Sequence, residues 1–221
     1  NTDAARKAKG VLAVLTGEDA VRAGYVKPLS FLTIAGKDGK KASIPERPVL
    51  AQGRVRFVGD LVALVIAETA LQAQDATELI EVDYEDLPAV VSPRATLEPG
   101  APQLHDNVPG NLCFEQEAGD AAAVAAAFAK AAHVTKLRLD VTRVAPNPME
   151  PRACAVAFDA ASGRFTVHSP VQGINMMRMQ LAAYTGVADD KIEVVARDVG
   201  GGFGQRSIAY PEYVALMLGA K

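Results

Sequence analysis

No part of this sequence limits the possible structures more than the run Gly200–Gly204, which places four glycines in five residues. Glycine loses more backbone entropy on folding than any other residue, so an ordinary surface turn uses only one or two. The run follows a segment that predicts a strand (191–196) and precedes one that predicts a helix (211–218). A glycine loop at such a junction can turn several backbone amides toward an anion or a polar cofactor edge. A tightly packed or flexible loop without a ligand is the alternative.

The two familiar glycine motifs do not fit this run. A dinucleotide fingerprint of the form GxGxxG starting at Gly200 needs a sixth residue that is glycine, and Gln205 stands there. A phosphate loop needs Gly-Lys before a hydroxyl residue, whereas Ser207 follows Gln205 and Arg206. The sequence therefore argues against nicotinamide and nucleoside triphosphate binding.

The first ninety residues predict a small α+β unit. Strands are expected at 11–15, 61–67 and 80–84, and a helix at 70–79 that begins after the N-cap Thr69. The Thr16–Asp19 segment predicts a turn. Residues 24–53 are rich in Gly, Pro and Lys and predict a long surface excursion with one short strand at 31–34. A proline-rich linker at 91–112 is expected to follow domain 1–90.

The second predicted domain, 113–221, alternates helices and strands. The first helix should begin after Asp120, with Val124 and Phe128 on its core face. A strand at 134–144, a hairpin of 153–158 with 164–168, and a helix at 173–184 ended by Gly186 should follow. The final helix should begin at Pro211.

Outside the glycine run, few residues suggest chemistry. Gln172 stands at a strand-to-helix junction, where its amide can both donate and accept; a local helix cap is the alternative. Glu150 and Arg152 lie between prolines and could form an ion pair that holds a turn. The histidines are scattered, and Cys113 and Cys154 form no CxxC pair, so no metal ligands are expected.

Composition excludes several classes of function. The 221 residues are 49% hydrophobic with a net charge of −3, and no long block of one sign suggests a nucleic-acid or anionic membrane surface. No apolar run is long enough to cross a bilayer, and the first residues do not resemble a signal peptide. A cytoplasmic location is the expectation.

Together these segments resemble the molybdenum-binding large subunit of the xanthine oxidase, aldehyde oxidase and carbon monoxide dehydrogenase family. Residues 10–20, 54–69 and 80–91 resemble its a/b hammerhead domain. The MEPR sequence at Met149–Arg152, the acidic–glycine turn at 159–163, Gln172 and the glycine run follow the family order of its first molybdopterin-binding domain. The resemblance implies that 1–90 is a hammerhead domain and that 113–221 begins the cofactor-binding domain. Both ends of the chain are expected to be cuts in a longer subunit.

The resemblance also implies a chemistry. Family members hydroxylate aldehydes or N-heterocycles, or oxidise carbon monoxide, with water as the oxygen source. Their molybdenum is held by a molybdopterin dithiolene, here expected in the cytosine dinucleotide form, and not by protein side chains. Iron–sulfur and FAD centres are expected on partner subunits or domains, and a small molecule is the expected substrate.

Carried over residue by residue, Gln172 resembles the glutamine that hydrogen-bonds the apical oxo ligand. The loop that approaches molybdenum and pterin in the family is matched by Gly201, Gly202, Phe203 and Gly204. Arg206 stands where relatives commonly carry Lys, and it is expected to bind the cofactor together with this loop. The family's general-base glutamate lies beyond this stretch, so no catalytic residue is expected here and the isolated chain should be inactive. The alternative is a stand-alone, non-catalytic assembly module on the same scaffold.

Overall fold

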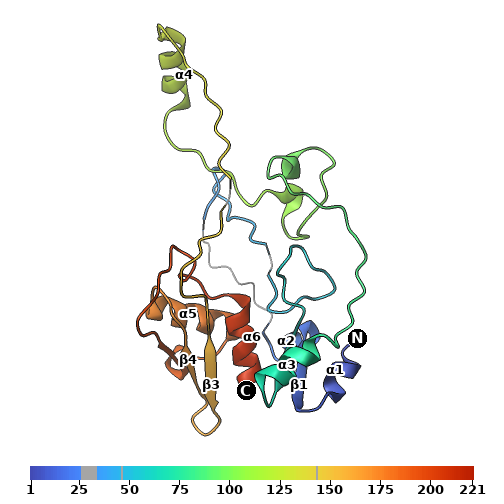
Figure 1. Ribbon diagram of the computed structural model, residues 1–221. Helices are drawn as coiled ribbons and strands as arrows, with labels where there is room; N and C mark the ends of the chain where they lie inside the picture. The colour runs from blue at the N-terminus through green and yellow to red at the C-terminus, as the bar shows by residue number, and fades with distance from the viewer. Residues whose placement is uncertain (26–33, 46, 143) are drawn as a thin grey trace.

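The structure, a computed structural model, describes residues 1–25, 34–45, 47–142 and 144–221 (Figure 1). The first part is built on a two-stranded antiparallel sheet of β1 (Val11–Thr16) and β2 (Ala63–Ala67). Three helices surround it: α1 (Asp3–Lys7), α2 (Gly17–Arg22) and α3 (Ala70–Thr77). The predicted strand at 31–34 lies outside the described residues except for Ile34.

Local capping explains both where prediction succeeded and where it failed. The Thr69 hydroxyl accepts a hydrogen bond from the Gln72 amide at 3.2 Å, which confirms the predicted start of α3. The predicted turn at 16–19 is wrong, because it is the start of helix α2. The Thr16 amide donates to Asp19 Oδ2 at 2.8 Å in a capping box, so polar residues that suggest a turn begin a helix instead.

Two predicted strands are wrong for a common reason. Residues 80–84 and the described residues of 134–144 form no strand, and neither segment lies beside a strand among the described residues. Glu81 exchanges backbone hydrogen bonds with Asn1, at 3.1 and 2.7 Å, but this single pair does not make a strand. Alternating apolar residues form a strand only beside a neighbour that completes its hydrogen bonds. Leu137 and Val141 therefore stay largely exposed.

The second part contains a three-stranded sheet in the order β3-β4-β5. The predicted hairpin is confirmed: β3 (Ala155–Asp159) pairs antiparallel with β4 (Arg164–His168). Helix α5 (Ile174–Thr185) connects β4 to β5 (Ile192–Val195), which lies parallel to β4. Gly186 ends α5 in the left-handed conformation at φ +73°, as predicted.

The last helix, α6 (Pro211–Ala220), begins at the predicted proline and joins the two parts. A Cβ at Gly219 would lie 3.0 Å from the Leu64 side chain and 3.1 Å from that of Ile66, so the helix backbone approaches β2 closely. The core is continuous across both parts, and its members include Val49, Leu50, Phe165, Val167, Met177, Leu181, Tyr213, Val214 and Met217. The mixed architecture confirms the α+β prediction.

Residues 118–142 form an arm that projects away from this body and carries helix α4 (Ala121–Lys130) near its tip (Figure 1). The predicted cap is confirmed, because Asp120 Oδ1 accepts from the Ala123 amide at 2.9 Å. The predicted core face is wrong: Val124 and Phe128 are 54% and 61% exposed. Three short 3-10 turns complete the structure, at Ala95–Leu97, Pro109–Asn111 and Asp189–Lys191. Within the described ranges, no helix is long and apolar enough to span a bilayer.

Candidate cofactor-binding site

The glycine loop follows β5 and is held in two tight turns. The Gln205 amide donates to the Gly202 carbonyl at 2.8 Å, and the Ser207 amide donates to the Gly204 carbonyl at 3.4 Å. Gly201 and Gly204 have φ values of +99° and +83°, which strongly favour glycine. Phe203 also has a positive φ, +47°, an uncommon conformation for an aromatic residue that surrounding contacts must maintain.

Two further glycines are required because side chains pack directly on the loop backbone. A Cβ at Gly202 would lie 2.4 Å from Gln172 Cδ, and a Cβ at Gly200 would lie 2.5 Å from Glu150 Cβ. Both distances are far shorter than a van der Waals contact. The loop is therefore a packed structure in which Gln172 and Glu150 lie against the main chain.

Gln172 is anchored to the far end of the loop by three hydrogen bonds. Its side-chain Oε1 accepts from the Arg206 backbone amide at 3.3 Å and from Ser207 Oγ at 3.1 Å. Its backbone amide donates to the Arg206 carbonyl at 3.1 Å. Gly173 is the N-cap of α5 and no side chain caps that helix, so the helix-cap alternative for Gln172 is wrong. No acceptor for the side-chain NH₂ of Gln172 is found in the described part of the chain.

Arg206 links the MEPR segment to the loop from inside the protein. Its side chain is fully buried, and Nη1 lies 2.5 Å from Glu150 Oε2. Nη2 donates to the carbonyls of Glu150 and Pro151. The same carboxylate oxygen of Glu150 accepts from the Gly200 amide at 2.7 Å, so one carboxylate fixes both ends of the loop.

The predicted ion pair between Glu150 and Arg152 is wrong. Arg152 pairs with Glu212 instead, at 2.9 Å, and its guanidinium carbon lies 3.8 Å from the centre of the Tyr210 ring. Sequence reasoning missed the partner of Glu150, because Arg206 lies 56 residues further along the chain. It also missed Ser207, whose hydroxyl helps to orient Gln172.

Electrostatics keep the Glu150 carboxylate charged. The Gly200 N–H and then the Arg206 guanidinium hold the pKa of Glu150 below its ordinary value. A negative charge beside a buried guanidinium compensates its desolvation, which makes burial of Arg206 possible. The pair is therefore a structural support for the loop at neutral pH.

The glycine loop leaves several hydrogen-bond donors without a partner. Among the described residues, none accepts from the backbone N–H groups of Gly201, Gly202, Phe203 or Gly204. We call these four N–H groups, together with the Gln172 NH₂, the donor face. No group of three His, Cys, Asp or Glu side chains that could hold a metal ion occurs within the residues described. The donor face suits an anionic or polar cofactor edge.

Comparison with family models assigns both parts of the chain. Residues 104–221 match the molybdopterin cofactor-binding domain, and residues 1–88 match the a/b hammerhead domain of aldehyde oxidase and xanthine dehydrogenase. The first of these matches spans more than half of the chain.

Relatives with known names agree with these matches. The carbon monoxide dehydrogenase large chain of Afipia carboxidovorans is 35% identical over 99% of this chain and 27% of its own length. The nicotine 6-hydroxylase large subunit of Paenarthrobacter nicotinovorans is 34% identical over 79% of this chain and 21% of its own length. This chain therefore spans about a quarter of the length of these two relatives.

Solved structures show the same fold. The reconstituted carbon monoxide dehydrogenase from Oligotropha carboxidovorans superposes with a TM-score of 0.86 at 33% identity, over 100% of this chain and 28% of that chain. Quinoline 2-oxidoreductase from Pseudomonas putida 86 gives a TM-score of 0.85 at 29% identity, over 100% and 27%. The chain belongs to the family of molybdenum-binding large subunits that includes xanthine dehydrogenase, aldehyde oxidoreductase and carbon monoxide dehydrogenase.

Proposed function

We propose that this chain forms one wall of the molybdenum-cofactor site of a molybdenum hydroxylase. The observation that carries the proposal is the donor face, where the Gln172 NH₂ and four successive loop amides have no acceptor within the described protein. When bound, the molybdopterin cofactor supplies oxygen transfer from water and takes up two electrons from the substrate. Everything else in the proposal concerns what the side chains and backbone of this chain do.

In this proposal, Gln172 would donate from its NH₂ to the bound cofactor while its Oε1 stays bound to the loop. The loop N–H groups at 201–204 would hold the cofactor as further hydrogen-bond donors. Arg206 acts through the loop, because its guanidinium is buried against Glu150 and the main chain rather than directed outward. Arg206 is therefore a positioning residue in the cofactor site.

The finer points of function rest on the relatives. We propose a small aldehyde, an N-heterocycle or carbon monoxide as substrate, since the named relatives include carbon monoxide dehydrogenase and nicotine hydroxylase. The proposed partners are subunits or domains carrying iron–sulfur clusters and FAD, together with the remainder of a large subunit. The cytosine dinucleotide form of the cofactor, a cytoplasmic location and the inactivity of the isolated chain stay predictions.

The exposed apolar arm favours contacts with further polypeptide. Its apolar side chains, which include Val124, Phe128, Leu137, Leu139 and Val141, cover no core in this structure. A helix of ten residues without tertiary packing is marginal in water, so α4 needs a partner surface. The same observation favours the second candidate function, a non-catalytic assembly module.

Cofactor content separates the two candidates. The complete gene product, purified with its partner subunits, should contain about one molybdenum per copy, and Gly202→Val should lose most of it because the new side chain collides with Gln172. Gly173→Ala is the matched control, since a Cβ there meets only Met176 Cβ, at 3.8 Å. Molybdenum-free wild-type protein would support the assembly module, and normal molybdenum in Gly202→Val would remove the loop from the site.

A further inference from the structure

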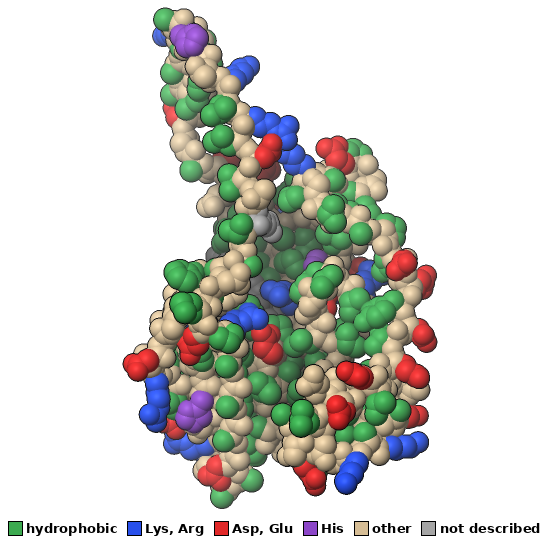
Figure 2. All heavy atoms as spheres, viewed as in Figure 1, with side chains coloured by type: hydrophobic (Ala, Val, Ile, Leu, Met, Phe, Trp, Pro, Cys, Tyr) green, Lys and Arg blue, Asp and Glu red, His purple; other side chains and the backbone are tan. Residues whose placement is uncertain are grey.

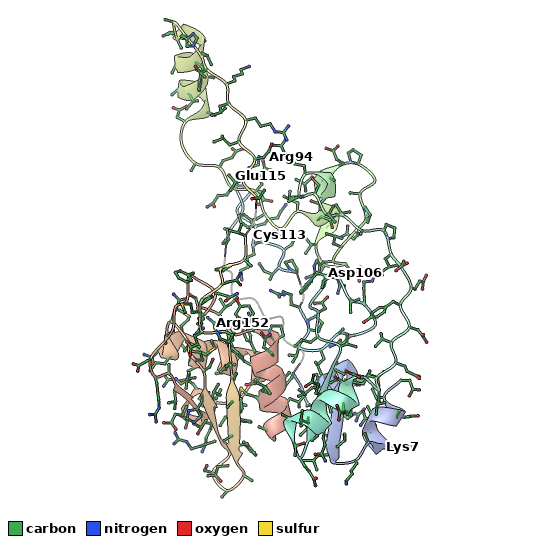
Figure 3. All side chains as sticks on the ribbon, viewed as in Figure 1. Lys7, Arg94, Asp106, Cys113, Glu115 and Arg152 are labelled. Atoms are coloured by element: carbon green, nitrogen blue, oxygen red, sulfur yellow. The ribbon has the colours of Figure 1, made fainter. Side chains whose placement is uncertain are left out.

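A cavity of about 320 Å³ lies between the two parts of the chain, away from the donor face. Its lining comes from residues 47–61, from His105, and from Arg152 with the start of α6, and it includes neither Gln172 nor any residue of the glycine loop. Figure 2 shows basic side chains gathered in the hollow between the two parts. Figure 3 labels Arg152 and Asp106, which lie on facing sides of this hollow.

Positive charge dominates the lining. The basic side chains are Arg47, Arg54, Arg56, Arg152 and His105, whereas the acidic ones are only Asp60 and Glu212. Both carboxylates are already engaged: Asp60 Oδ2 accepts from the Arg56 amide at 2.7 Å, and Glu212 pairs with Arg152. Asp106, outside the lining, reaches only to 4.0 Å from Arg54.

The arginine side chains keep donors for a further partner. Arg56 donates from Nε to the Leu104 carbonyl at 2.8 Å. No acceptor for its two terminal nitrogens is found among the described residues. Arg47 lies with its guanidinium carbon 5.8 Å from the centre of the Phe57 ring, and no ion pair of Arg47 is found among the described residues. Planar guanidinium edges match the paired oxygens of carboxylates and phosphates.

His105 is half-buried in the same wall. Burial is the main cause that lowers the pKa of His105; among the nearby charges, Arg56 and Arg47 lower it, whereas Asp60 and Asp106 raise it. Apolar surface from Phe57, Leu61 and Tyr210 completes the wall. A cavity of this size lies at the lower end of the range for small-molecule sites, which is roughly 300–1,000 Å³.

We propose that this cavity is a second ligand site, which binds a small organic anion: a carboxylate or phosphate group on a compact apolar body. The guanidinium groups of Arg47, Arg54 and Arg56 receive the oxyanion, and Phe57 with Leu61 packs against the apolar body. The site is separate from the proposed cofactor wall and does not depend on the molybdenum function.

Histidine NMR of the full 221-residue chain tests the proposal. The chain has three histidines, so the imidazole signals distinguish the cavity from the arm and from strand β4. Titration with benzoate, and separately with inorganic phosphate, should move the His105 signal along a saturable curve at millimolar or lower concentration. The signals of His133, on the arm, and His168, in β4, should stay in place.

Substitutions locate the binding. Arg47→Gln and Arg54→Gln should each weaken benzoate or phosphate binding about tenfold, which corresponds to about 1.4 kcal/mol. Arg138→Gln is the matched control, because Arg138 lies on the exposed arm beside Asp140. The two cavity variants, Arg47→Gln and Arg54→Gln, leave Arg56 and its hydrogen bond to the Leu104 carbonyl in place.

The outcomes are distinct. The site is supported if either probe shifts the His105 signal along a saturable curve, and if this binding is weaker in the cavity variants but unchanged in Arg138→Gln. If only benzoate or only phosphate binds, that result identifies the oxyanion that the site prefers. If neither probe gives a saturable shift of His105, the proposal is overturned. Equal weakening in Arg138→Gln also overturns it, because the effect would then come from net charge.

Discussion

Replacing the buried guanidinium of Arg206 is the sharpest perturbation of the loop support. Arg206→Met keeps most of the side-chain length but removes the ion pair with Glu150 and the hydrogen bonds to the carbonyls of Glu150 and Pro151. Breaking a buried ion pair costs about 3–5 kcal/mol. The Glu150 side chain is 39% exposed, so water can solvate the carboxylate that remains. We therefore expect the free energy of unfolding to fall by about 2–4 kcal/mol.

Arg152→Met is the control, because the same change there removes a partly exposed pair with Glu212 and a contact with Tyr210. It should cost only about 1–2 kcal/mol. Urea unfolding followed by far-UV circular dichroism measures both values. The double variant Glu150→Met/Arg206→Met should lose less than the sum of its single changes. A loss in Arg206→Met no greater than in Arg152→Met would refute the assignment of Arg206 as the loop support.

Three further predictions follow from named contacts. Gly202→Ala should lower the free energy of unfolding by about 1–3 kcal/mol, because the new Cβ displaces Gln172 from its two loop donors. Adding Gln172→Ala to this variant should recover part of the loss, as measured by urea unfolding. The pKa of Glu150 lies below its ordinary 4.5, so its charge stabilises the fold above about pH 4.5, and this contribution fades as the pH falls further. The stability of Glu150→Gln should therefore decrease less steeply with falling pH than that of the wild type. Burial raises the pKa of the Cys154 thiol to about 11. Unfolding in urea at pH 8 should therefore speed its alkylation by iodoacetamide about a hundredfold, as measured by mass spectrometry. An equal rate of alkylation in the folded chain would contradict the burial of this thiol.

Sequence signals were reliable where the structure depends on near neighbours. Thr69 and Asp120 cap their helices, Gly186 ends α5, and Pro211 begins α6, because each acts on backbone groups within a few residues. The hairpin of β3 and β4 was equally predictable, since its turn is local. These elements frame the glycine loop, so its place between a strand and a helix was predicted correctly.

Prediction failed where structure depends on distant partners. The alternation at 80–84 and 134–144 is typical of strands, yet no neighbouring strand exists for either among the described residues. The contact between Glu150 and Arg206 could not be read from spacing, and the nearer Arg152 was the wrong partner. Local patterns indicate which residues can pair, whereas tertiary packing decides which ones do.

The substitution Gln172→Glu, made in the complete gene product with its partner subunits, shows whether the Gln172 NH₂ faces the molybdenum cofactor. This change keeps the oxygen that accepts from Arg206 and Ser207 but replaces the NH₂ donor with a second oxygen. Gln74→Glu on helix α3 is the matched control. Molybdenum content and the Mo(V) electron paramagnetic resonance spectrum should be measured together. Only Gln172→Glu should show an altered Mo(V) spectrum or lost molybdenum; a normal spectrum at full molybdenum content would contradict a contact between Gln172 and the cofactor.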